Sequence, residues 1–210
     1  PVSAYLHSAT MVKAGIFLLA RLSPIFVGAA LYHNIVTFVG LLTFVMAAFF
    51  AIFKEDLIGL LAYSTICHLG LIVCLLGIGS PLAIAAAIFH IINHATFKAA
   101  LFMIAGIIDH ETGTRDLRKL SGLWQLLPFT ATLTMITAAA MAGVPLTNGF
   151  LSKEMFFTEL VANLSGPVLI FAAILATLAG VFAVTYSIRL VHGVFFDGPI
   201  GLQVPNKEAH

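Results

Sequence analysis

Charged side chains are scarce in this chain of 210 residues. Asp, Glu, Lys and Arg together make up 9% of it, whereas hydrophobic residues make up 60% and the mean hydropathy is +1.07. A soluble domain carries about 25% charged residues, so the composition predicts an integral membrane protein embedded in a lipid bilayer. The net charge is only +1 and no basic cluster stands out, so nucleic acid is not an expected partner.

Cysteine is also scarce. Cys67 and Cys74 are the only two, and they lie seven residues apart in one apolar run. Two thiols on one face of a predicted span are interpreted as small apolar fillers, so they indicate neither a disulfide framework nor a redox compartment. The chain starts at Pro1 without a signal-peptide pattern, and we interpret it as a piece of a longer protein.

Long apolar runs dominate the rest of the chain and predict an all-α polytopic membrane protein of about six transmembrane helices. The six runs cover residues 2–22, 31–53, 57–79, 81–108, 123–161 and 167–196. Their connections are short except for the charged stretch 109–122. The tail 197–210 is polar and is expected to be a cytoplasmic linker or a cut connection.

The fifth run is predicted to be one crossing made by a broken helix. Its middle reads Gly-Val-Pro-Leu-Thr-Asn-Gly over residues 143–149. Pro145 removes a backbone donor, and Gly149 allows non-helical angles. Unwound backbone at membrane depth is tolerated only inside protein or beside a water-filled cavity, and broken helices of transporters mark ion sites. The break therefore predicts a functional site near Lys153, which follows it.

The positive-inside rule gives the orientation. If the six runs alternate, one side holds Lys54, Arg115, Arg118, Lys119 and Lys207, with Arg189 near it. The other side holds only Arg21. The first side is predicted to be cytoplasmic, and both ends of the chain face it.

The run over 81–108 is the most informative one. His90, His94 and Lys98 follow one another at intervals of four residues, so they share one face of a helix. The run is roughly 40 Å long at ~1.5 Å per residue, which places His94 and Lys98 near its middle. Ionisable groups at that depth are costly and usually functional. A desolvated lysine can exchange its proton and an arginine cannot, so the pattern predicts stations for a proton.

Other interpretations of this stripe stay open. The spacing of His90 and His94 resembles that of a zinc-peptidase helix, but Ile91 stands where the general-base Glu would be. We therefore expect no metal at these residues. Each histidine could instead bond a neighbouring helix in a packing role, and Lys98 could extend its ammonium to a neighbour or to the interface.

Four further residues join the candidate relay. His7 and Lys13 lie in the first run and His68 lies in the third, and together they place polar groups on separate spans that could hold a file of waters. Alternatively, the histidines are packing residues, and Lys13 sets the local potential. Lys153 is predicted to be a gate that Glu154 and Glu159 influence as charge partners. Its other interpretation is an interfacial lysine paired with one of these carboxylates.

Several segments resemble the antiporter-like subunits shared by respiratory complex I and Mrp-type cation/proton antiporters. They are PVSAYLHSATMV (1–12), LAYST (61–65), FHIINHATFKA (89–99) and GFLSK (149–153). They occur in the order of that family and extend over nearly the whole chain. The stretches GIIDHETGTRD (106–116) and GFLSKEMFF (149–157) resemble the large A subunit of Mrp antiporters in particular.

The resemblance implies two inverted five-helix repeats. Residues 1–22 would be the last helix of the first repeat, and residues 23–196 the complete second repeat. The central lysine of the family falls on Lys98, its broken-helix lysine on Lys153, and its histidines on residues 7, 90 and 94. One position departs from the pattern, because Ile58 stands where many members have a lysine. The proton path is then expected to pass through His68 or water instead.

The implied function is proton conduction by an antiporter subunit in the bacterial plasma (inner) membrane. Lys98 would be the central relay and Lys153 the gate toward the outer side. The resemblance also implies coupling to sodium efflux, further subunits as partners, and neither covalent catalysis nor a cofactor. The alternatives are a proton-pumping subunit of complex I or of a membrane-bound hydrogenase, and a purely structural membrane scaffold.

Overall fold

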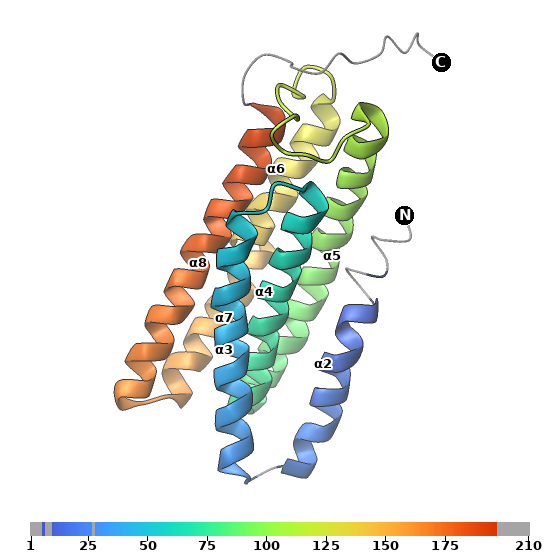
Figure 1. Cartoon of the computed structure of the whole chain (residues 1–210). Helices are drawn as coiled ribbons and strands as arrows, with labels where there is room; N and C mark the ends of the chain where they lie inside the picture. Colours follow the sequence, from blue (N-terminus) through green and yellow to red (C-terminus); the bar gives the residue numbers. More distant parts are fainter. Residues whose placement is uncertain (1–5, 7–9, 27, 197–210) are drawn as a thin grey trace.

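The computed structural model describes residues 6, 10–26 and 28–196, which form a bundle of long α-helices (Figure 1). The described residues contain seven α-helices, one short 3-10 helix and only an isolated β-bridge. This confirms the expected all-α class. The elements are α2 (Met11–Leu22), η2 (Ser23–Phe26), α3 (Ala30–Ile52), α4 (Leu57–Ile78), α5 (Pro81–Thr112), α6 (Pro128–Ala142), α7 (Asn148–Asn163) and α8 (Gly166–Phe195).

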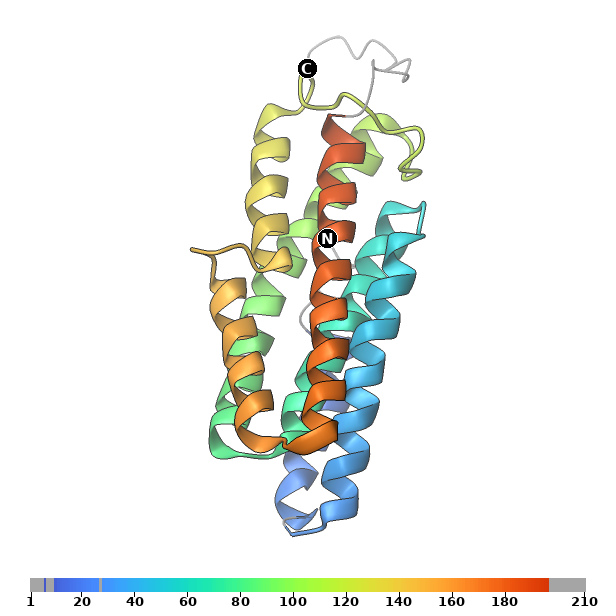
Figure 2. The same ribbon diagram turned by 90° about the vertical axis from the view of Figure 1, so that its left-hand side faces the viewer.

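Four of these helices, α3, α4, α5 and α8, are long and apolar enough to cross a membrane alone. Helices α6 and α7 lie one above the other along the bundle and together make one more crossing (Figure 2). The 12 residues of α2 extend only ~18 Å, so the remainder of the first predicted crossing lies outside the described residues. The five described crossings, one of them broken, agree with the expectation from the apolar runs.

Two helix boundaries differ from the expected ones. Helix α5 continues past Ile108 to Thr112, because its end is set by Gly113, whose φ of +71° favours glycine and whose N–H donates to the Asp109 carbonyl. Helix α6 begins at Pro128 instead of residue 123, since residues 123–127 form a turn before it. Proline is well suited to the first position of a helix, where no backbone donor is needed.

Helix α4 is the centre of the bundle and packs against α2, α3, α5, α7 and α8. Its contact with α3 is especially close, because glycines face the partner backbone. A Cβ at Gly40 would overlap the backbone of Cys74, and one at Gly70 would overlap the backbone of Phe44. Small residues at such contacts let membrane helices approach closely. This packing places the polar residues of α4 in the interior of the bundle.

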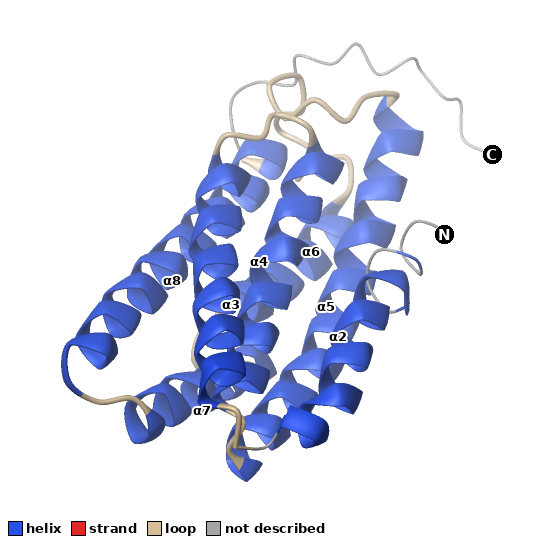
Figure 3. Cartoon of the chain, turned by 60° about the horizontal axis from the view of Figure 1, so that its bottom comes forward, coloured by secondary structure: helices blue, strands red, loops and turns tan. Residues whose placement is uncertain are grey.

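Apart from residues 143–147 between α6 and α7, the connections gather at the two ends of the bundle (Figure 3). One end, which we call the charged end, carries residues 53–56 and 113–127 (Figure 1). These connections are joined there, since Leu57 donates to the Arg115 carbonyl over 2.9 Å and Leu117 to the Glu55 carbonyl over 2.8 Å. The helices alternate between the ends as predicted. The assignment of the charged end to the cytoplasm stays a prediction.

Candidate functional site

The predicted break lies between α6 and α7 and covers residues 143–147. Helix α6 ends at Gly143, whose φ is +83°. Leu146 has a φ of +76°, which is uncommon for a residue with a side chain, and it is fully exposed. Thr147 then caps α7, because its hydroxyl accepts from the Phe150 N–H over 3.3 Å. The broken helix expected from the sequence is therefore confirmed.

The start of α7 is fixed against its neighbours. Asn93 of α5 donates to the Asn148 carbonyl, and the Asn148 side chain donates back to Asn93, each over 3.1 Å. Gly149 lies against α6, where a Cβ would overlap the Ala140 carbonyl oxygen. Gly149 was expected to supply non-helical angles, but it lies in the first turn of α7 and instead permits a close approach of two backbones.

A chain of hydrogen bonds crosses the interior and links four helices. It runs from Tyr186 of α8 to His68 of α4 (3.5 Å), then to His90 of α5 (3.1 Å), Ser152 of α7 (2.9 Å) and the Gly149 carbonyl (3.1 Å). We call the side chains of Tyr186, His68, His90 and Ser152 the polar chain. All four are fully buried. Of the polar groups predicted on separate spans, only His68 belongs to the polar chain, where it meets His90.

His94 lies beside the polar chain without a bond to it. Its ring is fully buried, and neither ring nitrogen has a hydrogen-bond partner among the described residues. The nearest rings are His68 at 5.4 Å, Phe97 at 5.5 Å and His90 at 6.5 Å between centroids. Buried polar atoms without a partner are rare and require an explanation.

Lys98 is held by oxygen atoms of α4. Its ammonium donates to the Leu61 carbonyl over 3.2 Å and to the Ser64 hydroxyl, and the side chain is fully buried. In the described part of the chain, no carboxylate forms an ion pair with it. Ile58, where the resemblance leads us to expect a lysine, is half-buried and packs against the apolar core.

Lys153 reaches back to the end of α6. Its ammonium donates to the carbonyls of Met141 (3.0 Å) and Ala142 (2.7 Å), which the break leaves without helical donors. The C-terminal end of a helix carries a partial negative charge, so this contact stabilises the ammonium. Glu154 is exposed, and no carboxylate of the described residues lies within ion-pair distance of Lys153.

Glu159 lies near the end of the bundle opposite the charged end. Its buried carboxylate accepts from the Ser80 hydroxyl and from the Asn163 amide, the latter over 3.0 Å. Ser80 caps the start of α5. A cleft of about 380 Å³ opens beside Asn163, and its polar lining consists of His33, Asn34, Thr37 and Asn163.

The candidate residues of the first run are only partly covered by the structure. His7 lies outside the described residues. Lys13 of α2 is buried, and its ammonium donates to the Ile91 carbonyl of α5 over 3.2 Å, next to His90. Pro145 is exposed in the break.

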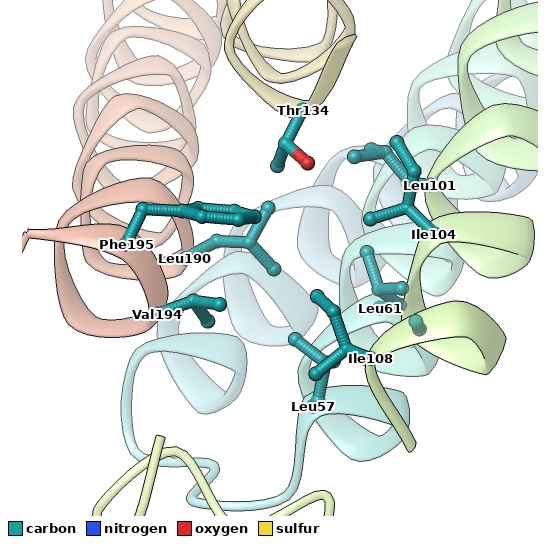
Figure 4. Close-up of a pocket in the computed structure, with 10 residues that line it drawn as sticks. Leu57, Leu61, Leu101, Ile104, Ile108, Thr134, Leu190, Val194 and Phe195 are labelled. Atoms are coloured by element: carbon teal, nitrogen blue, oxygen red, sulfur yellow. The ribbon is translucent and has the colours of Figure 1, made fainter. Parts of the chain in front are cut away.

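An apolar layer separates Lys98 from the charged end. It surrounds a cavity of about 10 Å³ between α4, α5, α6 and α8 (Figure 4), lined by Leu57, Leu61, Leu101, Ile104, Ala105, Ile108, Thr134, Leu190, Val194 and Phe195. The Thr134 hydroxyl donates to the Thr130 carbonyl of its own helix over 2.6 Å. A water needs several polar partners, so this cavity is no polar site.

Several residues of the site were not predicted as site residues. Ser152 lies inside the GFLSK stretch, and Tyr186 lies between Thr185 and Ser187 in an otherwise largely apolar helix. Asn93 and Asn148 likewise place amides at membrane depth. A polar atom within an apolar run was the available signal in each case, because such an atom needs a partner inside the bundle.

Comparisons with known proteins agree with the all-helical membrane fold. Residues 1–186 match the sequence profile of a family described as "NADH:quinone oxidoreductase/Mrp antiporter, TM". The chain is 64% identical over 200 residues to a probable K(+)/H(+) antiporter A/B subunit of Rhizobium meliloti (strain 1021), covering 95% of this chain and 20% of the relative. It is 57% identical over 174 residues to the A subunit of a Na(+)/H(+) antiporter from Alkalihalophilus pseudofirmus, covering 76% and 22%.

Two solved structures are similar to the chain. One is the Mrp complex from Dietzia sp. DQ12-45-1b, with a TM-score of 0.87 and 43% identity over 94% of this chain and 22% of the other. The second is the membrane-bound sulfane sulfur reductase, an archaeal respiratory membrane complex, with a TM-score of 0.87 and 28% identity over 99% and 42%. The chain thus spans about a fifth of the length of the two curated relatives described above.

Proposed function

The chain belongs to the NADH:quinone oxidoreductase/Mrp antiporter transmembrane family, and from this premise we propose that it is the proton-relaying part of the A subunit of a cation/proton antiporter. Lys98 is the central relay of this proposal, His90 and His94 are its links, and Lys153 is the gate. His68 and Lys13 complete the path. Two inverted repeats, divided after residue 22, remain part of the proposal.

One observation carries this proposal. Lysines and histidines of the four helices α2, α4, α5 and α7 lie in the interior of the bundle, and the partners that they have are hydroxyls, carbonyls and one another. Such groups are expensive at membrane depth and mark ion or proton pathways. A water bridging the ring nitrogens of His94 to its neighbours completes the path, because it gives the unpartnered imidazole the bonds it needs.

The two ends of the bundle differ in a way that supports an outward gate. The apolar layer lies between Lys98 and the charged end, whereas the cleft with His33, Asn34 and Thr37 opens at the opposite end. With the charged end in the cytoplasm of a bacterial cell, Lys153 is the station toward the outer side. Glu159 and the exposed Glu154 remain its proposed influences, acting over distance and not through an ion pair.

The transported cation and the partners belong to the longer protein. The names of the two relatives differ in their cation, one giving K⁺ and the other Na⁺. We assign sodium efflux to the whole protein, acting with other membrane subunits. A respiratory or hydrogenase-related proton pump is the second candidate, because the archaeal respiratory complex has the same fold. The higher identity to the antiporter relatives favours the first.

The test uses the full-length protein that contains this chain, in its assembled complex, in inverted membrane vesicles. Lys98→Ala is expected to abolish proton movement driven by added Na⁺ or K⁺, with unchanged amounts of assembled protein. Lys54→Ala is the matched control, since Lys54 lies at the charged end over the Tyr63 ring. Wild-type transport in Lys98→Ala would refute the relay, and equal activity with both cations would refute sodium as the specific substrate.

A further inference from the structure

The two ends of the polar chain are hydroxyl groups, and each hydroxyl has two possible acceptors. The Ser152 oxygen lies 2.9 Å from Nδ1 of His90 and 3.1 Å from the Gly149 carbonyl oxygen. A hydroxyl has one proton to donate and lone pairs with which to accept. If Ser152 donates to the Gly149 carbonyl, it must accept from His90. If it donates to His90, the ring nitrogen must be bare.

The other end has the same construction. The Tyr186 oxygen lies 3.5 Å from Nε2 of His68 and 3.9 Å from the Cys67 sulfur. Tyr186 can donate to His68, in which case Nε2 is bare. Alternatively, it can donate to the sulfur, a weak acceptor, and accept from Nε2 of His68.

A neutral imidazole carries one N–H, so the two hydroxyls determine the tautomers of both rings. In the first state, Tyr186 donates to His68, Nδ1 of His68 donates to His90, and Nδ1 of His90 donates to Ser152. In the second state, every bond is reversed, and both rings carry the proton on Nε2. The direct contact of 3.1 Å between the rings couples them, since exactly one of its two nitrogens carries a proton in either state.

From this geometry we infer that Ser152 and Tyr186 are positioning residues that set, and by rotating reset, the direction in which the His68–His90 pair passes protons. The inference rests on the proposed proton-conducting function. In one passage Nε2 of His68 takes up a proton from a hydronium ion of the proposed water path, Nδ1 of His68 gives one to Nε2 of His90, and Nδ1 of His90 releases one to a water on the other side. The pair keeps its number of protons and ends with both tautomers reversed.

The first state is the resting state. It uses the bond from Ser152 to a carbonyl oxygen and the bond from Tyr186 to a ring nitrogen. In the second state, the Tyr186 hydroxyl donates to the Cys67 sulfur over 3.9 Å and no longer to the ring nitrogen of His68. Sulfur is the poorer hydrogen-bond acceptor of the two. A second passage in the same direction therefore requires both hydroxyls to turn back.

The test reads the tautomers directly. The full-length protein, labelled with nitrogen-15 histidine and assembled in its complex in lipid bilayers, is measured by solid-state NMR, which separates protonated from bare ring nitrogens. His68→Gln and His90→Gln variants assign the signals. In the wild type, both rings are expected to carry the proton on Nδ1. A ring pair with one proton on Nδ1 and the other on Nε2 would overturn the inference.

Removing the two hydroxyls is expected to have opposite effects on the tautomers. Ser152→Ala leaves Nδ1 of His90 without an acceptor, so both rings are expected to carry their proton on Nε2. Tyr186→Phe leaves Nε2 of His68 without a partner at all, so both rings stay protonated on Nδ1. Both variants should slow transport by roughly 10- to 100-fold, the effect that losing an orienting hydrogen-bond partner has on metal-bound histidines.

Ser187→Ala is the matched control, because Ser187 is equally buried in α8 but donates only to the Ala183 carbonyl of its own helix. It should change neither the tautomers nor transport. Equal tautomers in Ser152→Ala and Tyr186→Phe, or wild-type transport in both, would overturn the inference. The proposed function is tested by transport in Lys98→Ala, whereas the control of the tautomers is tested by NMR. A failure of one can therefore be distinguished from a failure of the other.

Discussion

The cations in the interior of the bundle and those at its charged end have different kinds of partner. At the charged end, carboxylates face cations. The three ion pairs between arginines and carboxylates found within the described residues lie there, namely Arg115–Asp109, Arg118–Glu55 and Arg118–Asp116, as does the contact of 3.1 Å between the His110 ring and the Glu111 carboxylate. In the interior, Lys13, Lys98 and Lys153 donate only to carbonyl and hydroxyl oxygens.

This difference indicates what each set of charges does. A buried cation carries a desolvation penalty of several kcal/mol, which neutral oxygens offset only in part. Leucine in place of Lys98 would avoid that penalty, so stability does not explain the lysine. The ion pairs at the charged end are exposed to water and contribute little individually, but they join two connections. The oxygen partners of the interior lysines are what their proposed proton-relaying role leads us to expect, whereas the exposed ion pair between Arg118 and Glu55 links two connections.

The largest expected effect separates charge from proton exchange. Lys98→Arg keeps a cation beside Ser64, yet a guanidinium holds its proton at all physiological pH values. We expect transport in vesicles to fall to background, as in Lys98→Ala. Arg118→Lys at the charged end is the paired control and should transport normally. Transport by Lys98→Arg at the wild-type rate would mean that the interior needs only a fixed charge.

The next effect concerns the gate. Lys153→Ala removes the contact to the last carbonyls of α6 and should stop cation-driven proton movement while assembly continues. Glu154→Gln on the adjacent, exposed position should have a much smaller effect, because Glu154 forms no ion pair with Lys153. The comparison is made by initial rates in vesicles. A larger loss in Glu154→Gln than in Lys153→Ala would reverse the assigned roles.

A smaller loss is expected from changing the backbone at the break. Gly149→Ala places a methyl group on the Ala140 carbonyl oxygen, so α6 and α7 must separate, at a cost of about 1–3 kcal/mol. We expect reduced transport and a lower unfolding temperature of the complex. Gly106→Ala, also within a helix, meets no atom within 4 Å and should be neutral or stabilising. Similar behaviour of the two variants would contradict the close approach.

The smallest effect is expected at the charged end and depends on pH. Hydrogen bonds from Arg118 lower the pKa of Asp116 from an ordinary value of 3.8 to about 2. Because the pKa of Asp116 is lower in the folded loop than its ordinary value, the ionised carboxylate stabilises the loop above pH 3.8. This contribution is lost as the pH falls through about 2, where the carboxylate takes up a proton. The protection of the amides of residues 113–120, taken relative to their intrinsic exchange rates at each pH, should decrease over that range. Asp116→Asn should show the lower protection already at neutral pH, with unchanged transport.

The helices could be predicted from the sequence because apolar runs and their interruptions are local features. The break was predicted from Pro145 and Gly149 within residues 143–149, and the stripe of His90, His94 and Lys98 from a spacing of four residues. Helix ends were less certain, as at Thr112, where a glycine in a left-handed conformation sets the boundary and not the end of the apolar run.

The partners within the site could not be predicted in the same way. His90 bonds to Ser152, 62 residues away, and His68 to Tyr186, 118 residues away. Spacing rules describe one helix and say nothing about such pairs. Nearness in sequence also does not give the hydrogen-bond acceptors of Lys153, because these are the carbonyls of Met141 and Ala142 across the break.

One measurement tests the central claim most directly, namely that the interior lysine serves chemistry and not stability. Lys98→Leu removes the cation, and Ser64 keeps its own bond to the Leu61 carbonyl at 2.9 Å, so no donor is left unpaired. The thermal unfolding of the assembled complex and its cation-driven proton movement are measured on the same preparation. We predict an unfolding temperature equal to or above that of the wild type, together with loss of transport. A lower unfolding temperature with transport retained would contradict the account.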